Sequence, residues 1–162
     1  MVEAPEASAV PKYVLTVQRL LDAKLEQVWR CWTEPELLEK WFCPRPWFLT
    51  DARIDLRTGG EFSAVFNGPE GEKFNSVGVY LEIEHQRMLK STDAFLPGWI
   101  PSERAFMVSE ARFEEASGGC TEFTFRAMHW NESALKEHEQ MQFHAGWRKV
   151  VDQLEEIARS LD

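Results

Sequence analysis

The sequence has little cysteine and no long hydrophobic run. Its three cysteines, Cys31, Cys43 and Cys120, form no C-x-x-C pair, so neither a disulfide framework nor a thiolate zinc site is indicated. No stretch approaches the roughly 18 apolar residues of a membrane-spanning helix, and the opening residues, MVEAPEASAVP, lack the basic and apolar regions of a signal peptide. We therefore expect a cytoplasmic protein with reduced thiols and no membrane span.

Positive charge and catalytic signatures are also scarce. The chain has 18 basic and 27 acidic side chains, a formal charge of −9, and no basic run dense enough to neutralise a phosphate backbone. This composition argues against a nucleic-acid partner. The sequence contains no G-x-S-x-G elbow, P-loop or dinucleotide fingerprint, so it predicts no cofactor and no catalytic residue of those classes.

Hydrophobic residues, in contrast, are plentiful. They make up 44% of the 162 residues, enough for one domain to bury a core without disulfides or metals. Residues 1–11, rich in Ala, Pro and Glu, show no periodicity and are expected to be disordered. The remaining residues, 12–162, are expected to form a single domain.

Periodicity predicts one strand and two helices at the start of this domain. Tyr13, Leu15 and Val17 alternate with polar residues as in a half-buried strand. Asp22 is expected to cap a helix that buries Leu25, Val28, Trp29 and Trp32. Thr33 and Glu36 have capping-box spacing around Pro35, which predicts a second short helix at once.

Six further strands and a long helix complete the predicted order. Turn signals at residues 58–60, 67–69, 84–86 and 117–119 separate alternating segments, as in antiparallel hairpins. After His129 a period of 3.6 predicts one helix over residues 133–161, roughly 40 Å long at 1.5 Å per residue.

This order of elements resembles the SRPBCC or START-like superfamily. Three stretches carry the resemblance: "RLLDAKLEQVWRCWTEPELLEKWF", "DLRTGGEF" and a late "GW". Within that superfamily, the sequence is similar to the family of the activator of Hsp90 ATPase in its stand-alone bacterial form. The resemblance implies an α+β helix-grip (Bet v1-like) fold, in which a curved antiparallel sheet of about seven strands wraps a long C-terminal helix and leaves a cavity. Because dimers are common in the superfamily, a homodimer is left open.

Strand parity predicts which side chains face that cavity. Phe62, Ala64 and Phe66 share one side of their strand, and Val77, Val79, Leu81 and Ile83 share one side of the next. The same rule places the polar residues Ser91, Asp93 and His129 on otherwise apolar inward faces, either as ligand contacts or as groups bonded within the protein.

We therefore predict a cavity that binds a small apolar or lipid-like ligand, with Asp93 and His129 orienting a polar end. Trp99 lies in a proline-flanked loop, residues 96–102, that is a candidate flap. The predicted ligand-binding residues are Phe62, Phe66, Ser91, Asp93, Trp99, Phe123, Phe125, His129, Phe143 and Trp147. Any one of these aromatic residues could instead belong to an ordinary core.

Histidines near the last helix raise the question of a metal site. His138 and His144 are six residues apart, about 120° in azimuth on one helix, whereas a helical metal pair needs i, i+4 spacing. The sequence therefore predicts no metal site, and His138 is expected at the surface. The segment "HEQMQFHAGW" resembles a family pattern, H-E-x-M-G-F-H-x-G-W, with Gln142 in place of the usual Gly.

Two other function classes stay open. One is an interaction module that binds a chaperone, as the family name suggests. The other is a cyclase- or hydrolase-type enzyme, with His129 and Asp93 as acid and base. The residues favour a binding protein over an enzyme, because only the inward parity of these two side chains supports catalysis.

Overall fold

A computed structural model of the protein describes residues 10–161. The expected disordered segment therefore lies outside the described residues, except for Val10 and Pro11, which are exposed. The first strand, β1, spans Tyr13–Leu21 as the alternating pattern predicts. It pairs antiparallel with the last strand, β9 (Cys120–His129), so the first and last strands of the domain lie side by side.

The main sheet has seven antiparallel strands in the order β1-β9-β8-β5-β4-β3-β2. Its other strands are β2 (Phe48–Ile54), β3 (Glu61–Asn67), β4 (Lys73–Glu84), β5 (Met88–Thr92) and β8 (Val108–Ala116). The short 3-10 turn η1 (Ser117–Gly119) joins β8 to β9. All four predicted turn segments lie where one strand gives way to the next, and the strands on either side pair antiparallel, which confirms the hairpins.

The two short helices follow β1 as predicted, but both predicted caps are wrong. Helix α1 (Leu25–Thr33) begins after Lys24, whose backbone N–H is accepted by the Gln27 side chain at 3.3 Å. The Asp22 amide instead donates to Glu155. Helix α2 (Pro35–Leu38) is capped by Glu34, because Thr33 still belongs to α1 and its hydroxyl donates to the Trp29 carbonyl.

The alternation rule put Val77 and Val79 of β4 on the wrong face of the sheet. Val77 pairs with Ser63 and Val79 with Glu61, so these valines face the side of the sheet opposite Phe62. A bulge between Tyr80 and Glu82 then changes the parity. As a result Tyr80, not Val79, joins Ile83 in the core beneath the helices.

The predicted single C-terminal helix is two helices, α3 (Glu132–Gln140) and α4 (Phe143–Arg159). They part at Gln142, which has the left-handed conformation with φ 64°. A left-handed residue just after a helix end is a common helix stop and usually a glycine, so the family's glycine at this position was the signal for the break. The sequence pattern failed here because apolar spacing alone continues across the junction.

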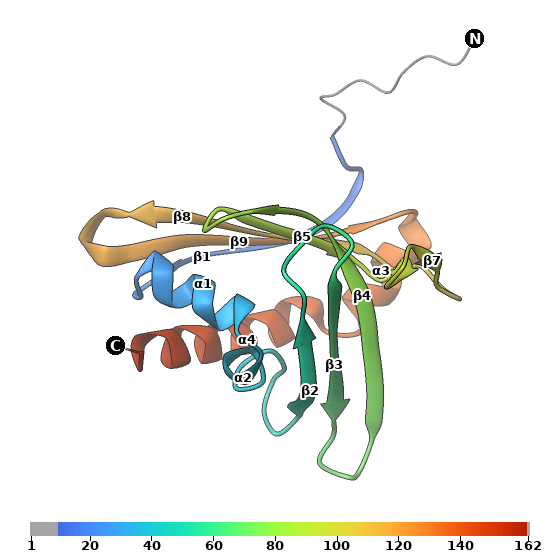
Figure 1. The fold of residues 1–162 in the computed structure, drawn as a ribbon, viewed down its shortest axis with the longest axis horizontal. Coiled ribbons are helices and arrows are strands. Elements are labelled where there is room, and N and C mark those ends of the chain that lie inside the picture. The colour runs from blue at the N-terminus through green and yellow to red at the C-terminus, as the bar shows by residue number, and fades with distance from the viewer. Residues whose placement is uncertain (1–9, 162) are drawn as a thin grey trace.

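Helices α1 and α4 lie on one side of the curved sheet, whose β2, β3 and β4 turn down beside α4 (Figure 1). The buried side chain of Gln153 links α4 to the segment after α2. Its nitrogen donates to the carbonyls of Trp41 and Cys43, and its oxygen accepts a hydrogen bond from the Arg45 amide. This is the helix-grip arrangement expected from the resemblance. Within residues 10–161, no helix is both long and apolar enough to cross a membrane.

Candidate functional site

An aromatic cluster fills the space between α4 and the inner face of the sheet. Trp147 of α4 stacks on Phe125 of β9 with ring centroids 3.9 Å apart. Trp32 of α1 lies nearly parallel to both rings, with interplanar angles of 11° to Trp147 and 19° to Phe125. These three flat rings on three different elements form the centre of the candidate site.

A second group of rings extends the cluster toward β3 and β4. Phe42 contacts Trp147, Phe62 and Phe66, with centroid separations of 6.2, 5.9 and 6.3 Å. Phe62 in turn stacks on Tyr80 at 5.1 Å. Trp147, Phe42, Phe62 and Phe66 are only partly buried, so the aromatic interior reaches solvent beside α4 and β3.

The structure brings six of the predicted ligand-binding residues into this cluster or its edge. They are Phe62, Phe66, Phe123, Phe125, Phe143 and Trp147. Parity could find the strand residues because burial alternates along the whole of β9 and because β3 pairs with β4 without a bulge. Sequence reasoning missed Phe42 and Tyr80 as neighbours of these rings; no sequence signal announces the bulge that turns Tyr80 inward.

The predicted polar residues already have partners within the protein. The Ser91 hydroxyl lies 2.7 Å from that of Ser109 on the neighbouring strand. One carboxylate oxygen of Asp93 accepts the backbone N–H groups of Phe106 and Met107 at 2.9 and 3.1 Å. These bonds hold the segment that leads into β8.

His129 and His138 form a hydrogen-bonded pair at the end of the sheet. His129 Nε2 lies 2.9 Å from His138 Nδ1, and His129 Nδ1 lies 3.2 Å from the Tyr13 carbonyl oxygen. Because a carbonyl only accepts, His129 carries its hydrogen on Nδ1; in a neutral ring Nε2 then accepts, and His138 donates. Burial and the nearby His129 lower the pKa of His138 to about 4.

The expectation that His138 lies at the surface is therefore wrong. It assumed one continuous helix, whereas the break at Gln142 reorients α3 and turns His138 toward Phe106, His129 and Phe143. His144 remains exposed. In the described part of the chain, no three His, Cys, Asp or Glu side chains gather in a way that could hold a metal ion.

Trp99 lies apart from the aromatic cluster. The predicted flap is a small hairpin of β6 (Phe95–Leu96) and β7 (Ile100–Pro101). The Trp99 ring packs edge-on against Phe95 and leans on Gly59, where a Cβ would lie 2.9 Å from the indole. Trp99 is nevertheless 49% exposed, as expected for a loop tryptophan.

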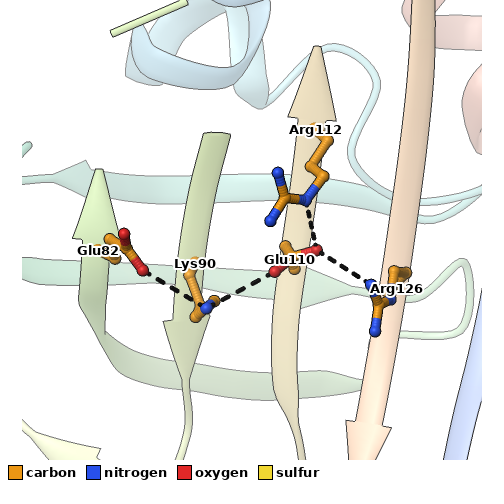
Figure 2. A network of polar contacts seen from close by, with 5 residues as sticks. All are labelled: Glu82, Lys90, Glu110, Arg112 and Arg126. Atoms are coloured by element: carbon orange, nitrogen blue, oxygen red, sulfur yellow. Dashed lines mark hydrogen bonds and ion pairs between the residues drawn. The ribbon is translucent and has the colours of Figure 1, made fainter. Parts of the chain in front are cut away.

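The outer face of the sheet carries a buried carboxylate. Glu110 of β8 is 4% exposed and is surrounded by Arg112, Arg126 and Lys90, with Glu82 next in the chain of ion pairs (Figure 2). Burial by itself would raise the pKa of Glu110, but the hydrogen bond and charge of Arg112, with Arg126 and Lys90, hold it below its usual value. The buried charge is thus fully paired.

Two surface hollows lie away from the aromatic cluster. One, of about 550 Å³, is open and lined by α3 residues such as Glu132, Lys136 and Gln140. The other, of about 290 Å³, lies over β8 and β9 and is lined by side chains that include Arg87, Glu114 and Thr124. Both are lined mainly by polar residues.

The comparisons with known proteins agree with this architecture. The model of the family "Activator of Hsp90 ATPase homolog 1-like protein" matches residues 22–159, and the chain belongs to this family. Among curated proteins, no similar sequence was found.

Solved structures support the same assignment. Protein NE0264 from Nitrosomonas europaea is 41% identical, with a TM-score of 0.87 over 91% of this chain and 94% of that one. A protein from Rhodobacter sphaeroides shares the fold with a TM-score of 0.79 at 21% identity, over 93% and 95% of the two chains. A protein from Arthrobacter aurescens does so with a TM-score of 0.78 at 20% identity, over 92% and 87%.

Proposed function

We propose that this protein binds a flat, apolar small molecule between α4 and the inner face of the sheet. The observation that carries the proposal is that aromatic rings on the inner face stay partly exposed there. Trp147, Phe62 and Phe66 are packed on the core yet accessible at its edge. Apolar and aromatic linings of this kind are typical of small-molecule sites.

The arrangement of the rings indicates the shape of the ligand. Trp32, Phe125 and Trp147 present nearly parallel planes. Trp147 alone of these three rings is partly exposed, so a planar molecule would stack on its accessible face. Phe123 and Phe143 close the site from β9 and α4.

Binding of N-phenyl-1-naphthylamine, a neutral aromatic dye that brightens in apolar surroundings, tests the proposal. We expect saturable binding that Trp147→Ala weakens about tenfold, because an aromatic contact is removed. Trp130→Ala is the matched control, since Trp130 is 53% exposed just beyond β9. Phe66→Leu, which changes less volume, repeats the test if Trp147→Ala unfolds. Unsaturable dye binding, or equal loss in the Trp130 variant, contradicts the proposal.

A second candidate function is binding to another protein, a chaperone, as the family's name suggests. The β6–β7 hairpin favours it, because Leu96, Trp99 and Ile100 are 37%, 49% and 56% exposed. An exposed tryptophan such as Trp99 is common at protein interfaces. A pull-down with the host's Hsp90 homologue tests it: Trp99→Ala should abolish capture, and no capture by the unmodified protein excludes the idea.

The acid–base role of Asp93 and His129 has less support. Both side chains hold backbone groups of the protein, Asp93 at residues 106 and 107 and His129 at Tyr13. A group committed in this way has a structural role without any substrate. We therefore rank an enzyme below the two binding functions.

A further inference from the structure

Helix α3 is attached to the rest of the domain by few side chains. None of residues 132–140, all of which the structure describes, is buried, whereas the adjacent α4 buries six residues. The attachments of α3 include the ion pair of Glu137 with Arg104 at 2.6 Å, the hydrogen bond of His138 with His129, and the partly buried Leu135. A segment with so little buried surface can open locally while the remaining fold persists.

The chain leaves helical geometry at both ends of α3. Asn131, before the helix, is extended with φ −154°, and Gln142, after it, is left-handed with φ 64°. The left-handed conformation is unfavourable for a residue with a side chain, so movement at Gln142 would relieve strain. Because β9 ends at His129 and α4 begins at Phe143, α3 can move between these two points without disturbing either element.

His138 is the residue of α3 that a proton would change most. Its ring centroid lies 5.0 Å from that of Phe106 and 4.9 Å from that of Phe143. Because its Nδ1 donates to His129, an added proton must bind at Nε2, which bonds to none of the described residues. Protonation therefore keeps the hydrogen bond but places a positive charge between two aromatic rings.

The charged and titratable groups around His138 do not offset that charge. They come from every element packed there: His129 of β9, Arg104 and Asp93 beside Phe106, Glu137 of α3, and His144 of α4. Glu137 favours a charged His138, but it is exposed and paired with Arg104. Arg104 already lies over the Phe106 ring, 5.8 Å from its centroid. Burial, followed by the charge of His129, lowers the pKa of His138 to about 4.

We propose that α3 is an acid-released cover over one end of the aromatic cluster: protonation of His138 detaches the helix from Phe106 and Phe143, while the sheet and α4 stay folded. Phe143 is 3% exposed and lies next to Phe125 and Trp147, with centroid separations of 6.5 and 6.3 Å. Detachment therefore exposes the end of the cluster that His138 now covers. The release requires no ligand, so it stands apart from the proposed binding function.

The difference in His138 pKa between docked and released α3 sets the size of the effect. The pKa is about 4 in the docked helix and returns toward its ordinary value of 6.5 in the released one. Docking is therefore fully favourable above pH 6.5 and weakens as the pH falls toward 4. Between pH 7.5 and 4.5 the ratio of docked to released α3 should fall about 50- to 100-fold.

The Cα chemical shifts of the isotopically labelled full chain test this release. An isolated helix of nine residues does not persist in water, so a released α3 loses its helical shifts. As the pH falls from 7.5 to 4.5, residues 132–140 should move to random-coil values while residues 143–159 stay helical. The midpoint of this change should equal that of the His138 ring signals. Loss of helical shifts in both segments together, their retention in both, or two different midpoints would overturn the proposal.

Two substitutions separate His138 from other groups that titrate in acid. His138→Gln cannot become charged, so residues 132–140 should stay helical at pH 4.5. His144→Gln is the matched control, because His144 is exposed beside Phe143, and it should release α3 at the same pH as the unmodified protein. Release at pH 4.5 in the His138 variant, or its absence in the His144 variant, contradicts the proposal. If His138→Gln lacks the α3 helix already at pH 7.5, the two midpoints in the unmodified protein decide.

Discussion

One buried carboxylate on the outer face of the sheet and two buried donors beneath its inner face differ in their pairing, although other inner polar groups such as Ser91 are paired. On the outer face, the carboxylate of Glu110 is buried but meets Arg112, Arg126 and Lys90 (Figure 2). On the inner face, Trp32 and Tyr80 are buried without a partner for their polar atoms. The sheet can therefore supply hydrogen-bond and ion-pair partners to a buried polar group.

The difference teaches that burial alone does not identify a functional group. Glu110 is a buried ionised side chain, which often marks an active site, yet its partners explain its ionisation entirely. The neutral donors of the inner face have no such explanation inside the protein. The proposed ligand-binding surface lies on this inner side.

Lowering the pH should protonate His138 and so place an unpaired charge on the inner side of the sheet. His138 has a pKa of about 4 in the folded protein, below its unfolded value of 6.5. The unfolded chain therefore binds more protons in this range, and stability present above pH 6.5 is lost as the pH falls toward 4. The loss from this residue should be about 1–3 kcal/mol.

Urea denaturation between pH 7.5 and 4.5 measures that loss. His138→Gln removes the titrating group while carboxylates protonate in both proteins, so the difference between the two curves isolates the histidine. Parallel curves for the two proteins would show that His138 is not held neutral by its surroundings.

Removal of the outer carboxylate should have a smaller effect. Glu110→Gln should lower the free energy of unfolding by about 1–2 kcal/mol, because three cations lose their buried partner but can turn to water. Arg112, the most exposed of these cations, has 54% of its side chain accessible. Thermal denaturation at low and high salt measures the effect.

Glu114→Gln is the matched control for that variant. Glu114 is exposed on the same strand and should contribute less than about 0.5 kcal/mol. Equal effects in the two variants would mean that the network in Figure 2 has no special role in stability.

The smallest expected effect concerns Gln142, the residue at the junction between helices α3 and α4. Gln142→Gly should stabilise the protein by about 0.5–1 kcal/mol, because glycine adopts the positive φ of this residue without strain. Chemical denaturation measures the gain. Gln140→Gly is the control and should destabilise slightly, because Gln140 is the last residue of helix α3, where glycine is a poor helix former. A loss of stability at both positions would show that Gln142 is not strained.

Much of the fold could be predicted from the sequence because its signals are local. Glycine turns, the alternation of β3 and β9, and Pro35 at a helix start each depend on a few neighbouring residues. The family resemblance supplied the arrangement in space. The predicted cap at Asp22 failed because helix α1 begins later, after Lys24. The predicted cap at Thr33 failed because Thr33 still belongs to α1 and its hydroxyl donates to the Trp29 carbonyl.

The candidate site was less predictable, because two backbone irregularities decide it. The bulge after Tyr80 reverses the faces of β4, and the left-handed Gln142 turns His138 inward. The second carried a sequence signal, the usual glycine of the related segment, whereas the first carried none. Whether a buried donor is paired depends on orientation in three dimensions, so Trp32 and Tyr80 could not be distinguished from ordinary core residues.

The central claim, that the inner aromatic surface binds a flat apolar molecule, is tested most directly by contacts to a bound one. Isotope-filtered NMR of labelled protein with unlabelled fluorene would record nuclear Overhauser effects between ligand and side chains. We predict cross-peaks from fluorene to Trp147, Phe62 and Phe66. Cross-peaks confined to Trp99 and Ile100 of the β6–β7 hairpin, or none at all at saturating fluorene, would contradict the claim.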